Sequence, residues 1–389
     1  MKKYRYKIEP GKLFKEFLDS EKSGGFILIA CTLVSLILAN SSLASTYYQF
    51  LSLQAFGHNI VHWINDGMMT IFFLLIGLEL EREVYLGELS KIKNALLPIM
   101  AAIGGMLVPA FLYLYFNYGT SMQSGAGIPM ATDIAFALGI LSLLGTRAPT
   151  SLKIFLTALA VIDDLGAIII IAIFYTKSVL WTNLIIALVI FFVLLILNRT
   201  KVYSLIPYLI GGVAMWYFMS HSGVHATITG VLLAFVIPFG KRTEASPSYI
   251  LQHMLHKPVA FIVLPVFALA NTAIVMDGNI LNTLTENYSK GIAIGLIIGK
   301  PLGIFVFAFL SVRFRICSLP SNLNWQSILG AGVLGGIGFT MSIFITLLGF
   351  EDKTIINNAK LTILLSSFAA GILGYVLLNY TLKDKTVKT

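Results

Sequence analysis

Four charged residues lie inside long apolar runs of the sequence. Asp163 and Asp164 are neighbours in ALAVIDDLGAIII, Asp133 lies in ATDIA, and Lys300 lies in IGKP. An ionised side chain at mid-membrane costs at least about 2.5 kcal/mol, so such residues usually mark ion or proton pathways. Adjacent helical positions point about 100° apart, so Asp163 and Asp164 face different neighbours. One of them can therefore line a water-filled cavity while the other turns toward a neighbouring helix.

The oxygen atoms around these charges suit an alkali cation. Thr132 adds a hydroxyl group beside Asp133, and no Cys or His stands at ligand spacing. Hard oxygen donors favour hard cations such as Na⁺ and Li⁺. A carboxylate held away from water favours its protonated form, so protons compete with the cation for the same oxygens. The residues therefore predict that Asp163, Asp164 and Thr132 exchange Na⁺ or Li⁺ for protons. If two carboxylates take up protons as one Na⁺ leaves, the cycle is electrogenic.

Other functions of the same charges stay open at this point. Lys300 and one Asp could form a buried ion pair that only locks helices, but such a pair does not account for two adjacent carboxylates facing one base. An intramembrane aspartyl protease needs two carboxylates from different helices, so it would have to pair Asp133 with Asp163 or Asp164. A non-transporting receptor is another possibility. An organic-anion symporter of related architecture would need a wider and more polar cavity.

The composition indicates a chain that is solvated mainly by lipid. Of the 389 residues, 57% are hydrophobic and 12% are charged, and the mean hydropathy is +0.86, whereas a soluble domain carries roughly a quarter charged residues. A membrane-spanning helix needs about 20 apolar residues. The runs of that kind are residues 24–44, 60–80, 95–116, 125–144, 151–175, 179–198, 204–220, 222–239, 258–276, 290–312, 327–349 and 357–381. We therefore expect an all-α polytopic membrane protein with about twelve transmembrane helices in a single domain (24–381), a cytoplasmic leader (1–23) and a cytoplasmic tail (382–389).

The basic residues alternate along the chain. Of the 27 Lys and Arg, 22 fall in the termini and in every second loop, and Lys300 lies inside a span. The four placed in the intervening loops are Lys177, Lys290, Lys353 and Lys360. The positive-inside rule predicts this pattern for an even number of spans with both termini in the cytoplasm. A surface for nucleic acid or another acidic partner would have contiguous basic residues, so the net charge of +9 does not indicate such a partner.

Two of the predicted spans are poor continuous helices. The fourth contains Gly125, Gly127 and Pro129 just before Thr132, and the eleventh contains the run GVLGGIGFT, residues 332–340. Paired interrupted spans are the best sequence indication of a transporter's binding site, where half-helix ends meet the ion. Asp133 would neutralise the partial positive charge of half-helix N-termini, and Lys300 the partial negative charge of the C-termini. Both would then support the site electrostatically.

Several segments resemble the NhaA family of bacterial sodium/proton antiporters. They are FFLLIGLELERE (72–83), IPMATDIAFALGILSLLGTRAP and LKIFLTALAVIDDLGAIII (within 128–170), HSGVHATITGVLLAFVIP (221–238), LPVFALANTAI (264–274), GKPLGI (299–304) and GGIGFTMSIFI (335–345). The similarity covers nearly the whole chain, and ATDIAFALG together with IDDLGAI is highly specific. Inverted repeats with broken helices are described for this family.

The resemblance implies a fold and a site. It implies inverted repeats in which helices 4 and 11 are discontinuous and cross at mid-membrane, a cytoplasmic funnel, and Asp163 and Asp164 as the cation and proton site. Asp133 and Lys300 would lie near the crossing, with Lys300 paired to Asp163 when no sodium is bound. The protein would then be a secondary antiporter of the bacterial inner membrane, with no enzymatic activity and no cofactor.

The resemblance also implies a dimer and a response to pH. Members form homodimers partly through an extracellular hairpin after the first span, which matches the strand-prone segment 46–58 here. Members are activated at alkaline pH through a cytoplasmic cluster. The matching residues are Glu79, Arg82, Glu83, His253 and His256, with His225 near the other side. Gln252 stands where family members carry an acid, and this departure puts the pH set point in doubt.

Overall fold

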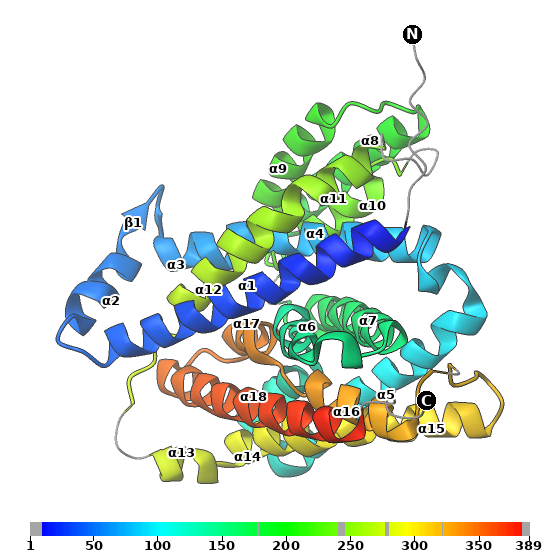
Figure 1. Cartoon of the computed structure of the whole chain (residues 1–389). Helices are drawn as coiled ribbons and strands as arrows, with labels where there is room; N and C mark the ends of the chain where they lie inside the picture. Colours follow the sequence, from blue (N-terminus) through cyan, green and yellow to red (C-terminus); the bar gives the residue numbers. More distant parts are fainter. Residues whose placement is uncertain (1–9, 177–178, 240–245, 277–279, 321, 383–389) are drawn as a thin grey trace.

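The protein is mainly helical, as predicted (Figure 1). The computed structural model describes residues 10–176, 179–239, 246–276, 280–320 and 322–382, and for residues 10–22 and 88 it describes the backbone only. Residues 1–9 of the predicted leader and residues 383–389 of the predicted tail lie outside the described residues. So does Lys177, one of the four bases assigned to the intervening loops.

The helices follow one another with short connections. They are α1 (Pro10–Ala39), α2 (Ala44–Ser52), α3 (Ile60–His62), α4 (Met69–Tyr85), α5 (Ile92–Asn117), α6 (Ile134–Leu143), α7 (Thr150–Phe174), α8 (Trp181–Arg199), α9 (Ile206–Ser220), α10 (Ile228–Val236), α11 (Pro247–Pro258), α12 (Leu264–Asn271), α13 (Ile280–Thr285), α14 (Asn287–Ile294), α15 (Lys300–Arg313), α16 (Trp325–Gly335), α17 (Phe339–Gly349) and α18 (Lys353–Thr381). The 3-10 helices are Glu88–Ser90, Ser121–Met130 and Gly145–Arg147, and the strands are β1 (Gln54–Ala55) and β2 (His58–Asn59).

Eight described helices are long and apolar enough to cross a membrane, or up to ten if each of two bent pairs is one span. One bent pair joins α1 to α2 at 113°, and the other joins α16 to α17 at 46°. Two predicted runs, 204–220 and 222–239, correspond to shorter helices, since α9 has 15 residues and α10 has 9. The protein is therefore a multi-pass membrane protein by length and composition.

Three of the long helices contain a widened turn of π-helix. The widened turns are Trp63–Met68, Val259–Val263 and Gly295–Gly299, and they join α3 to α4, α11 to α12 and α14 to α15. Pro265 and Pro301 follow the second and third of these turns within two residues. A proline lacks the amide hydrogen and its ring clashes with the carbonyl four residues earlier, so a locally widened turn accommodates it. Lys300 begins α15 directly after such a turn.

The predicted strand-prone segment 46–58 is mostly helical. Residues Ala44–Ser52 form α2, and only Gln54–Ala55 and His58–Asn59 pair as antiparallel strands. Phe56 and Gly57 make the turn with φ of 52° and 83°. The strand prediction was wrong over 46–52 because contacts distant in sequence hold the helix: the Tyr47 hydroxyl donates to the Leu269 carbonyl at 2.6 Å. Tertiary packing here overrides local propensity.

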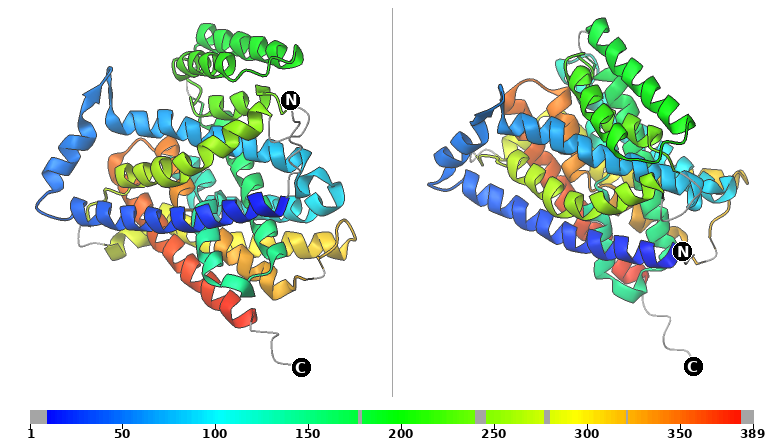
Figure 2. Two further views of the ribbon diagram at one scale, coloured as in Figure 1. Left: turned by 45° about the horizontal axis from the view of Figure 1, so that its top comes forward. Right: turned by 90° about the horizontal axis from the view of Figure 1, so that it is seen from above.

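The buried side chains form two separate hydrophobic cores. The smaller one joins α8, α9, α10 and α11 to the outer side of α4, and its members include Leu78, Tyr208, Met215 and Ala234. The larger core contains α5, α6, α7 and α15–α18. In Figure 2 the pair α8–α9 stands apart from the body of the molecule on one side. In Figure 1, α6, α7 and α17 lie in the middle of the molecule, with α1 above them and α18 below.

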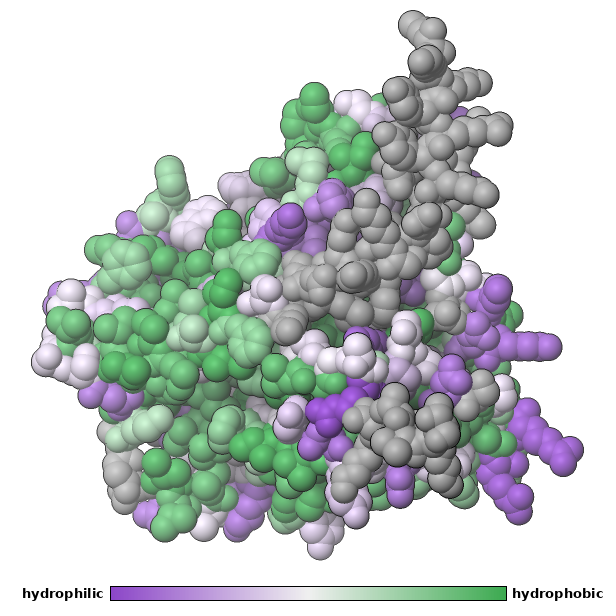
Figure 3. Space-filling view, viewed as in Figure 1, coloured by the Kyte–Doolittle hydropathy of each residue, from purple (hydrophilic) through white to green (hydrophobic). Residues whose placement is uncertain are grey.

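The outer surface is apolar over most of the face in Figure 3, and hydrophilic residues gather along its right edge. In the same view this edge carries the α4–α5 and α15–α16 connections. On α8 the side chains of Trp181, Phe192 and Ile196 are all more than half exposed, as expected of a helix that faces lipid.

The placement of Lys360 in a loop was wrong. This residue lies within α18 and is only 8% exposed.

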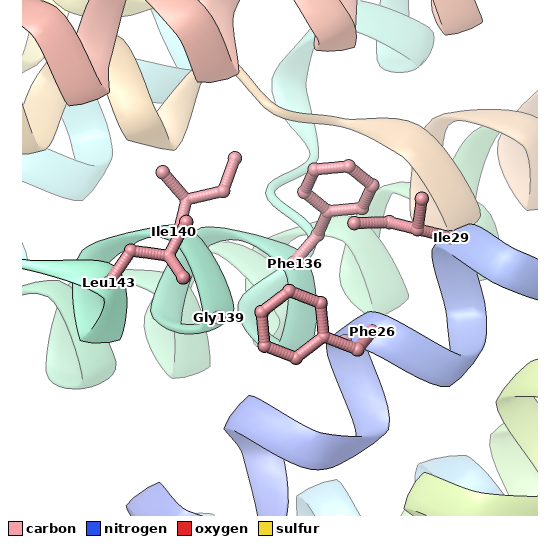
Figure 4. A pocket seen from close by; sticks show the side chains of 7 residues that line it. Phe26, Ile29, Phe136, Gly139, Ile140 and Leu143 are labelled. Atoms are coloured by element: carbon pink, nitrogen blue, oxygen red, sulfur yellow. The ribbon is translucent and has the colours of Figure 1, made fainter.

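Glycines bring α1 and α6 close together. A Cβ atom on Gly25 would lie 3.1 Å from the Ala135 carbonyl oxygen, and 3.7 Å from the Cα atom of Gly139. Beside this contact lies a small hollow in which Phe26 and Ile29 of α1 face Phe136 of α6 (Figure 4). The hollow has an apolar lining.

A second glycine contact fixes α15 against α5. A Cβ atom on Gly104 would lie 2.2 Å from the Gly303 carbonyl oxygen, and one on Gly303 would lie 2.1 Å from the Gly104 carbonyl oxygen. Only glycine allows two backbones to approach this closely. The contact lies one turn from Lys300 and sets the position of its helix.

We predict that Gly303→Ala lowers the stability of the folded protein by about 3 kcal/mol or more, because the added methyl group meets backbone atoms that cannot move aside. Gly139→Ala is the matched control. Its Cβ atom would meet only the Gly25 Cα atom at 3.8 Å, and alanine is the better helix former. Thermal unfolding in detergent, followed by size-exclusion chromatography, measures both. Equal melting temperatures for the two variants would contradict the prediction.

Candidate functional site

Helix α7 carries two adjacent carboxylates into the interior. Asp163 and Asp164 are both 0% exposed. The segment around them is a continuous helix from Thr150 to Phe174, because its residues alternate between helix formers and branched apolar residues without a proline. The two side chains leave the helix about 100° apart, and the structure gives them different surroundings, as the sequence predicted.

Asp163 is held by two neighbours from other helices. Its Oδ2 atom lies 2.9 Å from the Lys300 ammonium group and 2.7 Å from the Thr132 hydroxyl oxygen. The Thr132 hydroxyl also lies 3.0 Å from the Gly335 carbonyl oxygen, and its single hydrogen can donate to only one of the two at a time. The Oδ1 atom of Asp163 is buried without a hydrogen-bond partner. One side of the carboxylate is therefore compensated and the other is open.

Asp164 is not compensated by hydrogen bonds. Both of its carboxylate oxygens are buried and lack a partner, while Asp133 and Glu79 lie close enough to repel its charge. Burying an ionised carboxylate without a partner costs several kcal/mol. The carboxylate can avoid this cost only by holding a proton or a cation. This is the strongest local sign of a binding function in the described residues.

Both predicted breaks are present, and they contact each other. The first has 3-10 helix to Met130, extended backbone over 131–133 and α6 from Ile134; the second lies between Gly335 and Phe339. The Asp133 amide donates to the Ile337 carbonyl at 2.7 Å, and the Ser342 hydroxyl donates to the Ile128 carbonyl at 2.7 Å. The backbone groups that the breaks release thus find partners in each other, as a low-dielectric interior requires.

Asp133 accepts hydrogen bonds at the N-termini of two half-helices. Its Oδ1 atom accepts from the Phe136 amide of α6 at 2.9 Å. Its Oδ2 atom accepts from the Thr340 amide of α17 at 3.1 Å and from the Thr340 hydroxyl at 2.5 Å. A carboxylate at a helix N-terminus satisfies free amides and meets the positive end of the helix dipole. The geometry matches the predicted position of Asp133.

Lys300 lies at the C-terminal end of the 3-10 helix that precedes the first break. Its ammonium group is fully buried and also donates to the Met130 carbonyl, where the 3-10 helix ends. A cation beside the last carbonyls of a helix meets the negative end of its dipole. Asp133 therefore lies at the N-termini of both half-helices, and Lys300 lies at the C-terminal end of the segment before one of the breaks.

A small cavity lies next to Asp133 and Glu79. It has a volume of about 30 Å³, and Glu79, Asp133 and Thr340 are its polar lining residues. A cavity of this size holds about one water molecule when polar groups line it. The Glu79 side chain is only 4% exposed. The predicted apolar run ended at residue 80, directly after Glu79, whereas α4 continues to Tyr85.

The residues predicted to respond to pH do not all lie together. Glu79 and His256 are brought together, with the His256 Nδ1 atom 3.7 Å from a Glu79 oxygen. Arg82 and Glu83 pair with each other at 3.0 Å. His253 is exposed on α11. His225 lies apart from these residues, next to the end of α7. Its Nε2 atom is 3.0 Å from the Tyr175 carbonyl oxygen.

Sequence reasoning missed one buried pair in this region. Glu81 is 7% exposed and accepts a hydrogen bond at 2.7 Å from the Ser248 hydroxyl of α11. Gln252, one turn further along α11, is also buried. The alternation of acids and leucines in LELERE gave no sign that Glu81 would point inward, because its partner comes from a segment 167 residues away.

The donor set fits a small monovalent cation as a transported substrate. Carboxylate, hydroxyl and carbonyl oxygens converge at the two breaks, and oxygen donors suit hard cations. Among the described residues, no group of three or more His, Cys, Asp and Glu residues could hold a metal ion. The site therefore offers both side-chain and backbone oxygens to a transported ion.

The sequence matches a known family of transporters. It matches the family described as Na⁺/H⁺ antiporter 1 over residues 15–378. The Na(+)/H(+) antiporter NhaA of Flavobacterium psychrophilum is 70% identical over 97% of this chain and 98% of that protein. The proteins of the same name from Cytophaga hutchinsonii and Dechloromonas aromatica are 60% and 57% identical, over 96% and 95% of this chain and 96% of each relative. These relatives carry the names of transporters, and the chain belongs to the Na⁺/H⁺ antiporter 1 family, which its motifs resemble.

Proposed function

We propose that the protein exchanges cytoplasmic Na⁺ or Li⁺ for external protons across the bacterial inner membrane. The observation that carries this proposal is the fully buried pair Asp163 and Asp164, in which Asp164 has no hydrogen-bond partner for either oxygen. Na⁺/H⁺ exchange is also the activity in the names of the relatives. Such exchange serves sodium and pH homeostasis.

The chemistry follows from competition for the same oxygens. A proton on Asp164 removes its uncompensated charge, and a Na⁺ ion beside it does the same, but one oxygen cannot hold both well. When Na⁺ arrives, Asp163 has to give up part of its contact with Lys300, and the Thr132 hydroxyl can turn its hydrogen toward the Gly335 carbonyl. Its lone pairs then face the cation. Release of Na⁺ restores the ion pair and lets protons return.

We propose twelve transmembrane helices with the two broken spans crossing at mid-membrane. The order of elements supports two inverted repeats: α5, the broken span that ends with α6, and α7 in one half correspond to α14–α15, the broken span α16–α17, and α18 in the other. The twelve spans include α9 and α10, which are short. Half-helices that meet at a crossing are the usual site in transporters of this kind.

We propose that both termini face the cytoplasm and that residues 24–381 form one transporter domain between a leader and a tail. The alternation of 22 basic residues against four supports this orientation. The hydrophilic edge in Figure 3 lies at the α4–α5 and α15–α16 connections, which this topology assigns to the cytoplasm. The loss of Lys360 from the opposite loops makes the asymmetry stronger.

We propose a homodimer that uses the hairpin β1–β2. The hairpin projects beyond the helices at the left of Figure 1. The Phe56 side chain at its turn is 95% exposed, and an apolar ring so exposed fits an interface or a lipid contact.

We further propose that the pairs Glu79–His256 and Arg82–Glu83 belong to a cytoplasmic pH response, with His253 at its surface and His225 at the other side. Gln252 would shift its set point.

The alternative functions fit the site less well. An aspartyl protease would need Asp133 to share a proton with a second carboxylate, yet both Asp133 oxygens already accept hydrogen bonds. An organic-anion symporter would need a wider cavity than about 30 Å³ and less negative charge around it. Cleavage of a peptide in detergent, or uptake of a labelled organic anion, would favour these alternatives.

We predict that Asp164→Asn abolishes exchange. The amide cannot take up and release a proton, and it lacks the negative charge that would attract a cation. In proteoliposomes with a preformed pH gradient, added Na⁺ or Li⁺ should collapse the gradient for the wild type and leave it unchanged for Asp164→Asn. Asp66→Asn, outside the buried cluster, is the matched control and should retain exchange. Persistent exchange by Asp164→Asn, or none by the wild type, would overturn the proposal.

We predict that exchange moves net charge if both carboxylates bind protons in place of one Na⁺. An inside-negative membrane potential of 100 mV is worth about 2.3 kcal/mol per charge moved. Clamping the potential with K⁺ and valinomycin should therefore speed or slow Na⁺ movement according to its sign. Rates that stay the same at opposite potentials would indicate electroneutral exchange.

We predict that Asp133→Ala lowers the stability of the folded protein by about 3 kcal/mol or more, because it leaves buried donors on both half-helices without partners. Thr340→Val removes one of these hydrogen bonds and should cost less. Asp133→Asn keeps an oxygen for the Phe136 amide and should lie between them. Melting temperatures in detergent give the order, and an unchanged melting temperature for Asp133→Ala would contradict the support role.

A further inference from the structure

Besides Asp163 and Asp164, helix α7 carries a buried polar group to which the proposed exchange site gives no role. The Thr157 side chain is 5% exposed, and its hydroxyl oxygen has no hydrogen-bond partner. A threonine within a helix commonly donates to the carbonyl four residues earlier. Thr32, Thr70, Thr346 and Thr362 do so in this protein. Thr157 does not, although Lys153 offers that carbonyl, and an unsatisfied buried hydroxyl lowers stability.

Thr157 and Asp164 lie on one face of α7. Seven residues make nearly two turns, so the two side chains point within about 20° of each other and lie about 10 Å apart along the axis. Gly166, two residues after Asp164, faces roughly the opposite way. A Cβ atom there would lie 2.2 Å from the Met106 sulfur of α5. Thr157 and Asp164 therefore point away from the Met106 side chain of α5, and α4 and α6 are among the other helices that pack against α7.

Two other acids lie near Asp164. Glu79 comes from α4 and Asp133 precedes α6, and both act electrostatically on Asp164. The two acids line the cavity described above. Thr157 lies between Asp164 and the first turn of α7, which follows Arg147. In the proposed topology this end of α7 faces the cytoplasm, so Thr157 lies on the cytoplasmic side of Asp164.

We propose that the Thr157 hydroxyl contacts the cation on its cytoplasmic route to Asp164. The ligand is a partly dehydrated Na⁺ or Li⁺ ion, and the inference rests on the proposed exchange function. A hydroxyl with no internal hydrogen bond can offer its oxygen to a hard cation without first breaking one. The hydroxyl stays neutral at all transport pH values, so it lowers the barrier for the cation without adding a proton site. Thr157 is thus a residue that sets the rate of Na⁺ capture.

The test compares Thr157→Val, which keeps the shape and removes the oxygen, with Thr157→Ser, which keeps the oxygen. Purified wild type and variants are placed in proteoliposomes, and Na⁺-driven collapse of a pH gradient is followed over a range of Na⁺ concentrations. We expect kcat/KM for Na⁺ to fall about tenfold in Thr157→Val, which is the loss of one good polar contact, and to stay within about twofold of the wild type in Thr157→Ser. The pH profile at saturating Na⁺ should not change.

Thermal unfolding of the same proteins in detergent separates transport from packing. Because valine removes an unsatisfied polar group, Thr157→Val should melt at or above the wild-type temperature. A lower melting temperature, an unchanged kcat/KM in Thr157→Val, or an equal loss in Thr157→Ser would overturn the inference. If the wild type exchanges and Thr157→Val exchanges equally well, only this inference fails. A wild type without exchange would overturn the proposed function together with it.

Discussion

The rest of the structure depends on the electrostatic cost of Asp164. A carboxylate with no hydrogen-bond partner in an apolar interior is unstable as a bare ion, and no described neighbour neutralises it by direct contact. The surrounding architecture supplies positive charge only indirectly. Lys300 is committed to Asp163, and the half-helix N-termini are already satisfied by Asp133. The local charge balance therefore stays incomplete until a small cation or a proton is added.

The supporting groups are arranged so that this incomplete site does not collapse. Asp133 joins the N-termini of α6 and α17 through three hydrogen bonds, while Lys300 bridges the Asp163 carboxylate and the Met130 carbonyl. The breaks in the two spans are also joined to each other by hydrogen bonds. Backbone groups that would be unsatisfied in lipid are thus paired inside the protein. Both oxygens of Asp164 and one of Asp163, which we propose as ion ligands, are left without partners while other groups hold the two broken spans in place.

Much of this arrangement could be predicted from single residues. Charged residues in apolar runs are rare enough to indicate a candidate site, and Gly and Pro before Thr132 indicate the first break. The sequence could not give the contacts between distant segments. The predicted span 60–80 ended between Glu79 and Glu81, because hydropathy does not tell where α4 stops. Lys360 was assigned to a loop although α18 encloses it. The segment 46–52 has strand propensity, but Tyr47 binds a carbonyl 222 residues away and fixes a helix. The missing partner of Thr157 is likewise visible only in three dimensions.

The glycine contact between α5 and α15 limits how the molecule can change shape. At Gly104 and Gly303 backbone lies directly against backbone, so a sliding movement there would make backbone atoms clash, and we expect the two helices to move as one unit. Lys300 travels with that unit. Any alternation between inward and outward access must then be absorbed at a softer boundary, and the seam between the large and the small hydrophobic core is the one where side chains on both sides can repack.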